Sequence, residues 1–171
     1  MTGGWTRGQL EKILLIVAVA GVLYSRFTPT TCDARWTAHY LHRETREGDV
    51  VIFTSLSRLP VQHYWDRLQP PGRVQATSFP AEIDRHPGHE GPIHAPDAAG
   101  RLAVEATHLA ARIHDRLRGN PGARVFFLHG FRPATDAILK RMLDRDLQPS
   151  PPVRCGAPRN YIDAITLYRG R

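Results

Sequence analysis

The sequence predicts a three-layer α/β/α domain with a mostly parallel, Rossmann-like sheet, preceded by one N-terminal membrane helix. Two observations predict the domain: short β-branched apolar runs recur along the chain, and stretches with helical periodicity separate them. A third observation, an uncharged apolar run near the N-terminus, predicts the membrane helix. Strands that alternate with helices indicate a parallel or mixed sheet with helices on both of its faces.

The apolar run covers residues 13–24 and contains no charged side chain. Lys12 and Arg26 flank it, and basic residues at both ends favour membrane interfaces. The run is shorter than the ~20 residues that a spanning helix usually needs, but snorkelling of the flanking side chains extends it. Two alternatives are open: a signal peptide cleaved after Ala18-Val19-Ala20, and a buried soluble helix.

The membrane hypothesis defines three parts of the chain. Residues 1–12 are a cytoplasmic N-terminus, residues 13–27 are a single-pass anchor in the lipid bilayer of the cell membrane, and residues 28–171 are an extracytoplasmic α/β domain. Charge does not decide the orientation, because basic residues lie on both sides of the apolar run.

The first half of the domain alternates helix, strand, helix and strand. Residues 33–47 form a predicted helix, because an aspartate can cap its start and Gly48 ends it. Residues 49–54, Asp-Val-Val-Ile-Phe-Thr, form a continuous β-branched run that is typical of a strand buried on both faces. Residues 60–68 begin with a proline, which the first turn of a helix favours. Residues 73–79 predict a weaker strand.

The second half opens with a long irregular segment, residues 80–100, which contains several prolines and glycines. The clearest helical stripe of apolar residues follows it. The last strand has a mixed pattern, which predicts a place at an edge of the sheet. The elements of this half are a helix at residues 101–118, a buried strand at 124–128, a helix at 133–144, a proline-rich linker at 149–152 and a final strand at 161–169.

The carboxyl ends of the buried strands carry the candidate ligand-binding residues. Ser55 and Arg58 follow the first strand, and His129 and Arg132 follow the third. Folds of this class place ligands at these strand ends, and two arginines with a hydroxyl can hold an anionic group. The same residues are also common in ordinary loops. Because no G-x-S-x-G nucleophile elbow is present, we predict no catalytic residue.

Five potential metal ligands crowd residues 80–100, but prolines and glycines interrupt them, so no metal site is predicted. The chain also contains no G-x-G-x-x-G and no G-x-x-x-x-G-K-[ST] motif, so no cofactor is expected. The five potential ligands are Asp84, His86, His89, Glu90 and His94.

The formal net charge of +7 arises in residues 101–171, which carry thirteen Lys and Arg against six Asp and Glu. A basic face there suits anionic lipid, a phosphate-bearing substrate or nucleic acid, or is a solvated surface. Because no basic run is interleaved with aromatic residues, no nucleic-acid partner is expected. The two cysteines, Cys32 and Cys155, form one disulfide if the domain faces an oxidising compartment, and are otherwise two free thiols.

One succession of motifs is more informative than these candidates. It begins after the apolar helix and consists of Pro29-Thr30-Thr31, Asp33-x-x-Trp36-x-Ala38-x-Tyr40-Leu41, Gly48-Asp49-Val50-Val51-Ile52-Phe53 and Pro60-Val61-x-x-Tyr64-Trp65. It resembles the C-terminal extracytoplasmic domain of bacterial membrane glycosyltransferases of the dolichyl-phosphate-mannose type, which are related to aminoarabinose transferases. The match covers residues 10–70 best.

The resemblance implies a function without catalysis by this chain alone. In that family the membrane helices carry the active site and use a lipid-phosphate sugar donor, and this sequence contains no such helices. We therefore expect a non-catalytic domain that binds a partner membrane protein, such as a membrane glycosyltransferase subunit, or a glycan-related ligand. The alternative is a small membrane-bound enzyme that acts on an anionic or phosphate-bearing substrate at the strand ends.

Overall fold

The computed structural model describes residues 8–9, 11, 14–19, 32–69, 72–85, 96–130, 132–155 and 162–171, with only the backbone of Ser55. The chain divides into two compact units, Met1–Thr30 and Thr31–Arg171. In the first unit residues 14–19 are helical, and the rest of the predicted anchor lies outside the described residues. None of the helices in the described ranges has both the length and the apolar character needed to cross a bilayer.

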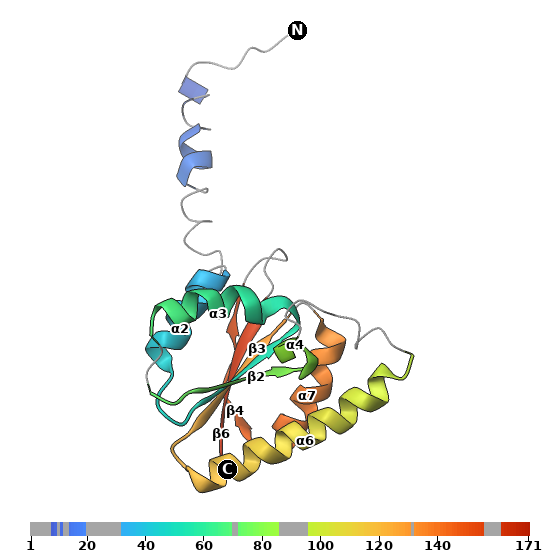
Figure 1. Ribbon diagram of the computed structural model, residues 1–171. Helices are drawn as coiled ribbons and strands as arrows, with labels where there is room; N and C mark the ends of the chain where they lie inside the picture. Colours follow the sequence, from blue (N-terminus) through green and yellow to red (C-terminus); the bar gives the residue numbers. More distant parts are fainter. Residues whose placement is uncertain are drawn as a thin grey trace. The chain divides into compact units, whose positions relative to one another are not determined.

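The second unit contains one mixed sheet (Figure 1). The strand order is β2-β1-β3-β6-β4, with β5 also paired to β6. Strand β1 is parallel to both β2 and β3, a Rossmann-like order, whereas β6 is antiparallel to β3, β4 and β5. The strands are β1 (Val50–Thr54), β2 (Gln75–Phe79), β3 (Arg124–His129), β4 (Gln148–Pro149), β5 (Val153–Arg154) and β6 (Ala164–Arg169).

The structure corrects three predictions that concern the C-terminal part of the sheet. The expected linker at 149–152 lies within an interrupted edge strand, because β4 and β5 pair with the same strand and the Ser150 amide donates to the Leu167 carbonyl at 2.8 Å. The prolines there fit an edge position, where a missing amide leaves no ladder bond unmade. Strand β6 therefore lies between β3 and β4 rather than at an edge, and the sheet is mixed rather than mostly parallel.

The helices agree with the predicted order, with small shifts at their ends. A 3-10 turn, η1, precedes α3, and a short helix, α4, lies within the segment expected to be irregular. Residues 86–95 of that segment lie outside the described ranges. The elements are α2 (Ala34–Glu44), η1 (Ser55–Ser57), α3 (Arg58–Arg67), α4 (Glu82–Arg85), α6 (Ala98–Gly119) and α7 (Pro133–Asp146).

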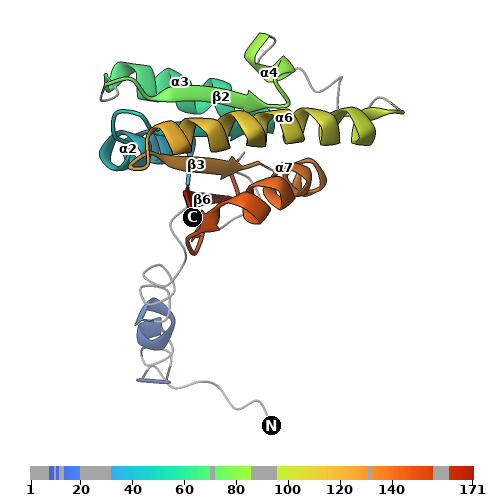
Figure 2. The same ribbon diagram turned by 90° about the horizontal axis from the view of Figure 1, so that it is seen from below.

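The core consists of two apolar clusters, one on each face of the sheet. Helices α6 and α7 cover one face, where they pack on Ile52 and Phe127, among others. Helices α2 and α3 cover the opposite face, where they pack on Phe53 and Phe126, among others. Figures 1 and 2 show these layers from two directions. Strand β1 is buried along its whole length, which explains why its residues Val50–Phe53 are continuously apolar rather than alternating.

Candidate functional site

The carboxyl ends of β1 and β3 meet at one edge of the sheet, because the two strands are parallel neighbours. Helix α3, after β1, packs on one face of the sheet, and α7, after β3, packs on the other. A change of face between adjacent parallel strands creates the crevice in which open α/β sheets bind ligands. Of the four candidate residues, His129 is the last residue of β3, and Ser55, Arg58 and Arg132 follow β1 or β3 in the sequence.

Arg58 is directed toward β2 and α4 rather than toward β3. Its guanidinium pairs with the Asp84 carboxylate, donates to Ser78 Oγ at 2.9 Å and to Gln62 Oε1 at 2.9 Å, and lies 5.5 Å from the centre of the Phe53 ring. The side chain is only 15% exposed. These contacts give Arg58 a structural role that ties α3 to β2 and α4.

His129 lies on the opposite face. Its Nε2 is 2.7 Å from Thr166 Oγ1 on β6, and its ring centre is 4.4 Å from that of Phe127, which belongs to the core beneath α6 and α7. Burial, with the nearby Lys140 charge, lowers the pKa of His129 to about 4, against a smaller opposing effect of Asp144. The imidazole is therefore neutral at physiological pH, and it does not add positive charge for an anion.

The structure therefore does not unite the predicted site. Arg58 packs over Phe53 on the α2/α3 face, whereas His129 packs on Phe127 on the α6/α7 face. Arg132 precedes α7, and its carbonyl accepts the Asp136 amide at 3.1 Å. The side chain of Ser55 lies outside the described part of the structure.

A buried carboxylate, Asp136, lies in the first turns of α7 and was not among the predicted residues. Its Oδ2 accepts the Gly130 amide at 2.7 Å, and its Oδ1 is buried without a hydrogen-bond partner among the described residues. The Thr54 hydroxyl, at the end of β1, donates to the Leu128 carbonyl at 2.8 Å. The only sequence indication was an acidic residue soon after a helix-starting proline, a position that the helix dipole favours.

Asp136 has the most unusual electrostatics at these strand ends. Burial raises its pKa to about 7 and the Asp163 charge acts in the same direction, whereas the hydrogen bond from the Gly130 amide opposes them. A carboxyl group with such a pKa can exchange a proton near neutral pH. With 3% of its surface exposed, however, Asp136 is closed to a substrate and instead holds the backbone amide of Gly130, the residue after β3.

The described residues hold no group of three or more side chains placed to bind a metal ion. Of the five potential ligands between residues 80 and 100, the structure describes Asp84 alone, and its carboxylate receives Arg58 and the Ser78 amide. The four others, His86, His89, Glu90 and His94, lie outside the described residues.

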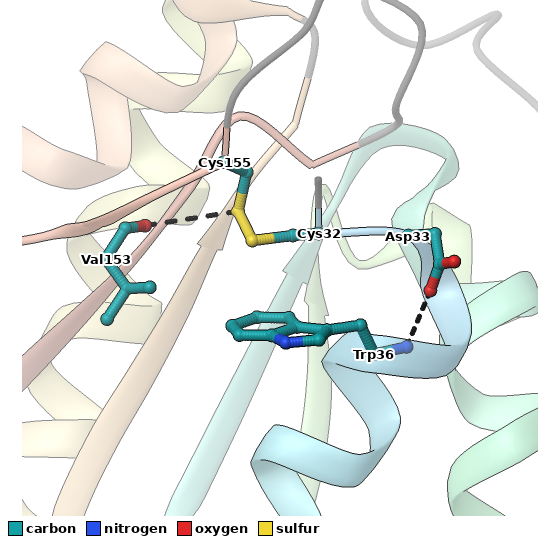
Figure 3. The surroundings of a disulfide bond; sticks show 5 residues. All are labelled: Cys32, Asp33, Trp36, Val153 and Cys155. Atoms are coloured by element: carbon teal, nitrogen blue, oxygen red, sulfur yellow. Dashed lines mark hydrogen bonds between the residues drawn. A yellow bond between two sulfur atoms is a disulfide. The ribbon is translucent and has the colours of Figure 1, made fainter. Parts of the chain in front are cut away.

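Cys32 and Cys155 form a disulfide (Figure 3). Cys32 is buried and directly precedes Asp33, whose carboxylate caps α2 by accepting the Trp36 amide at 2.6 Å. Cys155 follows β5, and its amide donates to the Asp163 carbonyl at 2.9 Å. The disulfide therefore ties the first described residue of the second unit to the edge of the sheet, across a sequence separation of 123 residues.

No protein-family model and no curated protein matches this chain. Among solved structures, a release-factor-specific protein-(glutamine-N5) methyltransferase from Alicyclobacillus acidocaldarius is similar, with 13% identity over 81% of this chain and 90% of that chain. The TM-score is 0.31. The likeness is a distant one between α/β folds, and no function is taken from it.

Proposed function

We propose that this chain is a membrane-anchored, non-catalytic domain that works outside the cytoplasm. It resembles the tail domain of a lipid-phosphate-sugar-dependent glycosyltransferase and binds a partner membrane protein or a glycan-related ligand. Residues 13–27 hold it at the bilayer, and residues 28–171 face the extracytoplasmic side.

The observation that carries this proposal is the disulfide between Cys32 and Cys155. Disulfides persist in oxidising compartments and are rare in the cytosol. Cys32 lies directly after the apolar segment and its short exit linker, which is the position where a tether would enter the folded domain. The disulfide joins that residue to the sheet edge. It would therefore resist unfolding at the α2 end of the domain, where an anchor would exert a force.

The contacts that the strand-end residues make within the fold support the non-catalytic part of the proposal. Arg58 and His129 both make contacts within the fold, and they lie on opposite faces of the sheet. An enzyme acting on an anionic substrate at these strand ends would need their side chains together and accessible. The structural contacts therefore favour the binding domain over the enzyme.

Site-directed thiol labelling in intact cells tests the proposed topology. Gln9 and Arg141 are both exposed, so Gln9→Cys reports on the N-terminal side and Arg141→Cys reports on the domain. With a membrane-impermeant reagent and no reductant, Arg141→Cys should react in intact cells and Gln9→Cys only after lysis. Labelling of Arg141→Cys only after lysis would overturn the extracytoplasmic location, and labelling of both in intact cells would overturn the single-pass anchor.

A further inference from the structure

A pocket of about 200 Å³ lies between α6 and β2, away from the carboxyl ends of the strands. Val50 and Gln75, the first residues of β1 and β2, both line it, so the pocket is at the amino ends of these strands. Leu109 and Ile113 of α6 add apolar surface. Figure 2 shows α6 running alongside β2.

The pocket exists because α6 covers the centre of the sheet better than its edge. In the core cluster on this face, β1 and β3 each contribute two side chains, whereas β2 contributes only Phe79, its last residue. Gln75 and Thr77, which line the pocket from β2, are polar and not buried. Among the described residues β2 pairs only with β1, so no further strand of that part of the chain covers this edge of the sheet.

Two arginines, Arg112 and Arg116, line the pocket from α6. Arg116 Nε donates to the Gly48 carbonyl at 3.2 Å, and neither guanidinium has a carboxylate partner in the described part of the chain. Arg112 is exposed, and its side chain makes no hydrogen bond in that part of the chain. The two other arginines within α6 behave differently, because each has a carboxylate partner: Arg101 pairs with Asp97 and Arg118 with Asp115.

The spacing of Arg112 and Arg116 makes their two positive charges repel each other. Residues four apart are neighbours on one face of a helix, and like charges at that spacing repel each other. An anion seated between the two guanidiniums removes this repulsion. Guanidinium groups also match the oxygen geometry of phosphate and carboxylate with paired N–H donors.

We propose that this pocket binds the phosphate group of a small phosphorylated ligand, with Arg112 and Arg116 on the phosphate and Gln75 and Thr77 on the ligand's hydroxyl groups. A phosphate monoester carries a charge of about −1.5 to −2 at pH 7, which matches two guanidiniums better than the single charge of a carboxylate. The amide and hydroxyl side chains both donate and accept hydrogen bonds. The pocket is smaller than the ~300 Å³ of the smallest usual sites for drug-sized ligands, so a compact head group fits it.

This site is independent of the proposed membrane topology, because it depends only on side chains within the second unit. Phosphate of this kind has two sources, a soluble sugar phosphate and a phospholipid head group. The tests therefore use the full chain in an uncharged detergent, with inorganic phosphate, glucose 1-phosphate, short-chain phosphatidic acid and succinate as separate probes.

Isothermal titration and amide chemical shifts measure binding of each probe. Inorganic phosphate should bind and shift the amides of Gln75 and Arg112. Arg112→Gln should weaken phosphate binding about tenfold or more, since a hydrogen bond to a charged group is lost. Arg101→Gln removes the same charge from the same helix outside the pocket, so it should leave binding unchanged.

A second variant tests the role of the polar wall. Thr77→Val should keep the affinity for inorganic phosphate and reduce the preference for glucose 1-phosphate, if that sugar phosphate is the tighter probe. Tighter binding of glucose 1-phosphate points to a soluble ligand and tighter binding of phosphatidic acid to a lipid head group, and both results support the phosphate site. No binding of inorganic phosphate at ~20 mM, equal binding of succinate, or equal losses in Arg112→Gln and Arg101→Gln would overturn it.

Discussion

Asp49 and Arg124 join the amino ends of the two central strands through a nearly buried ion pair. Arg124 Nη2 lies 2.8 Å from Asp49 Oδ2, and the Arg124 backbone amide donates to Asp49 Oδ1 at 2.8 Å. Asp49 Oδ2 also accepts the Arg46 amide at 2.8 Å. The Asp49 side chain is 1% exposed and that of Arg124 14%, so the pair is removed from solvent.

Asp49→Ala should destabilise the domain strongly. The substitution leaves the Arg124 guanidinium without its counter-ion and leaves the amides of Arg46 and Arg124 without their acceptor, and breaking a buried pair in this way costs about 3–5 kcal/mol. Urea denaturation followed by circular dichroism measures the loss. The matched control is Asp115→Ala, which breaks the exposed pair with Arg118 and should cost no more than about 1 kcal/mol. Equal losses in the two variants would contradict a special role for Asp49.

Removal of the disulfide by Cys32→Ser with Cys155→Ser should also lower the free energy of unfolding. Its sequence separation of 123 residues predicts a loss of about 4–5 kcal/mol from the greater entropy of the unfolded chain. Thermal unfolding of the wild type with and without reductant should reproduce the difference, and the double variant should not respond to reductant. A reductant effect of equal size in both proteins would show that its cause is not this bond.

The strands and helices could be predicted from the sequence because most of them carry a local pattern. The continuous apolar run at Val50–Phe53 is explained by burial on both faces of the sheet, and the apolar stripe of α6 by burial of one side of the helix. Strands β4 and β5 have two residues each, too few for any periodicity to appear. The antiparallel direction of β6 depends on its pairing with β3, which no local pattern records.

The candidate site was predicted less well, for a reason that concerns side-chain direction. The residues lie at or after the carboxyl ends of β1 and β3, but His129 is the last residue of β3 rather than the first residue after it. Successive side chains in a strand point to opposite faces. His129 lies two residues after Phe127 and therefore shares its face, beneath α6 and α7. Arg58 is instead the first residue of α3 and is held by Asp84. Asp84, which pairs with Arg58, lies 26 residues away in the sequence, so the local sequence could not predict the direction of the Arg58 side chain.

Asp136 should make the domain less stable as pH rises toward neutrality. Its pKa is raised to about 7 in the folded protein, against about 3.9 in an unfolded chain. Between these values the folded state holds a proton that the unfolded state has released, so the contribution of Asp136 to stability falls as pH rises through this window.

Asp136→Asn isolates this effect, because asparagine resembles the neutral acid and can still accept the Gly130 amide. The stability of the variant relative to wild type should therefore rise between about pH 4 and pH 7, by up to about 1.4 kcal/mol per pH unit. Urea denaturation at several pH values measures the difference. A difference that stays constant over this range would show that Asp136 is ionised in the folded protein throughout.

His129 should act in the opposite direction over part of the same range. Burial, followed by the Lys140 charge, lowers its folded pKa to about 4, against about 6.5 in an unfolded chain. Below pH 6.5 the His129 imidazole is protonated in the unfolded state but stays neutral in the folded state. The stability due to His129 is therefore lost as pH falls toward 4. His129→Gln, which can keep a hydrogen bond to Thr166, should remove this loss.

The direct measurement is an NMR titration of the His129 ring protons, whose midpoint should be about 4. A midpoint near 6.5 would mean that the ring leaves its place between Phe127 and Thr166. Because the effects of Asp136 and His129 oppose each other between about pH 4 and pH 6.5, the wild-type profile alone would hide both, and the two single variants are needed to separate them.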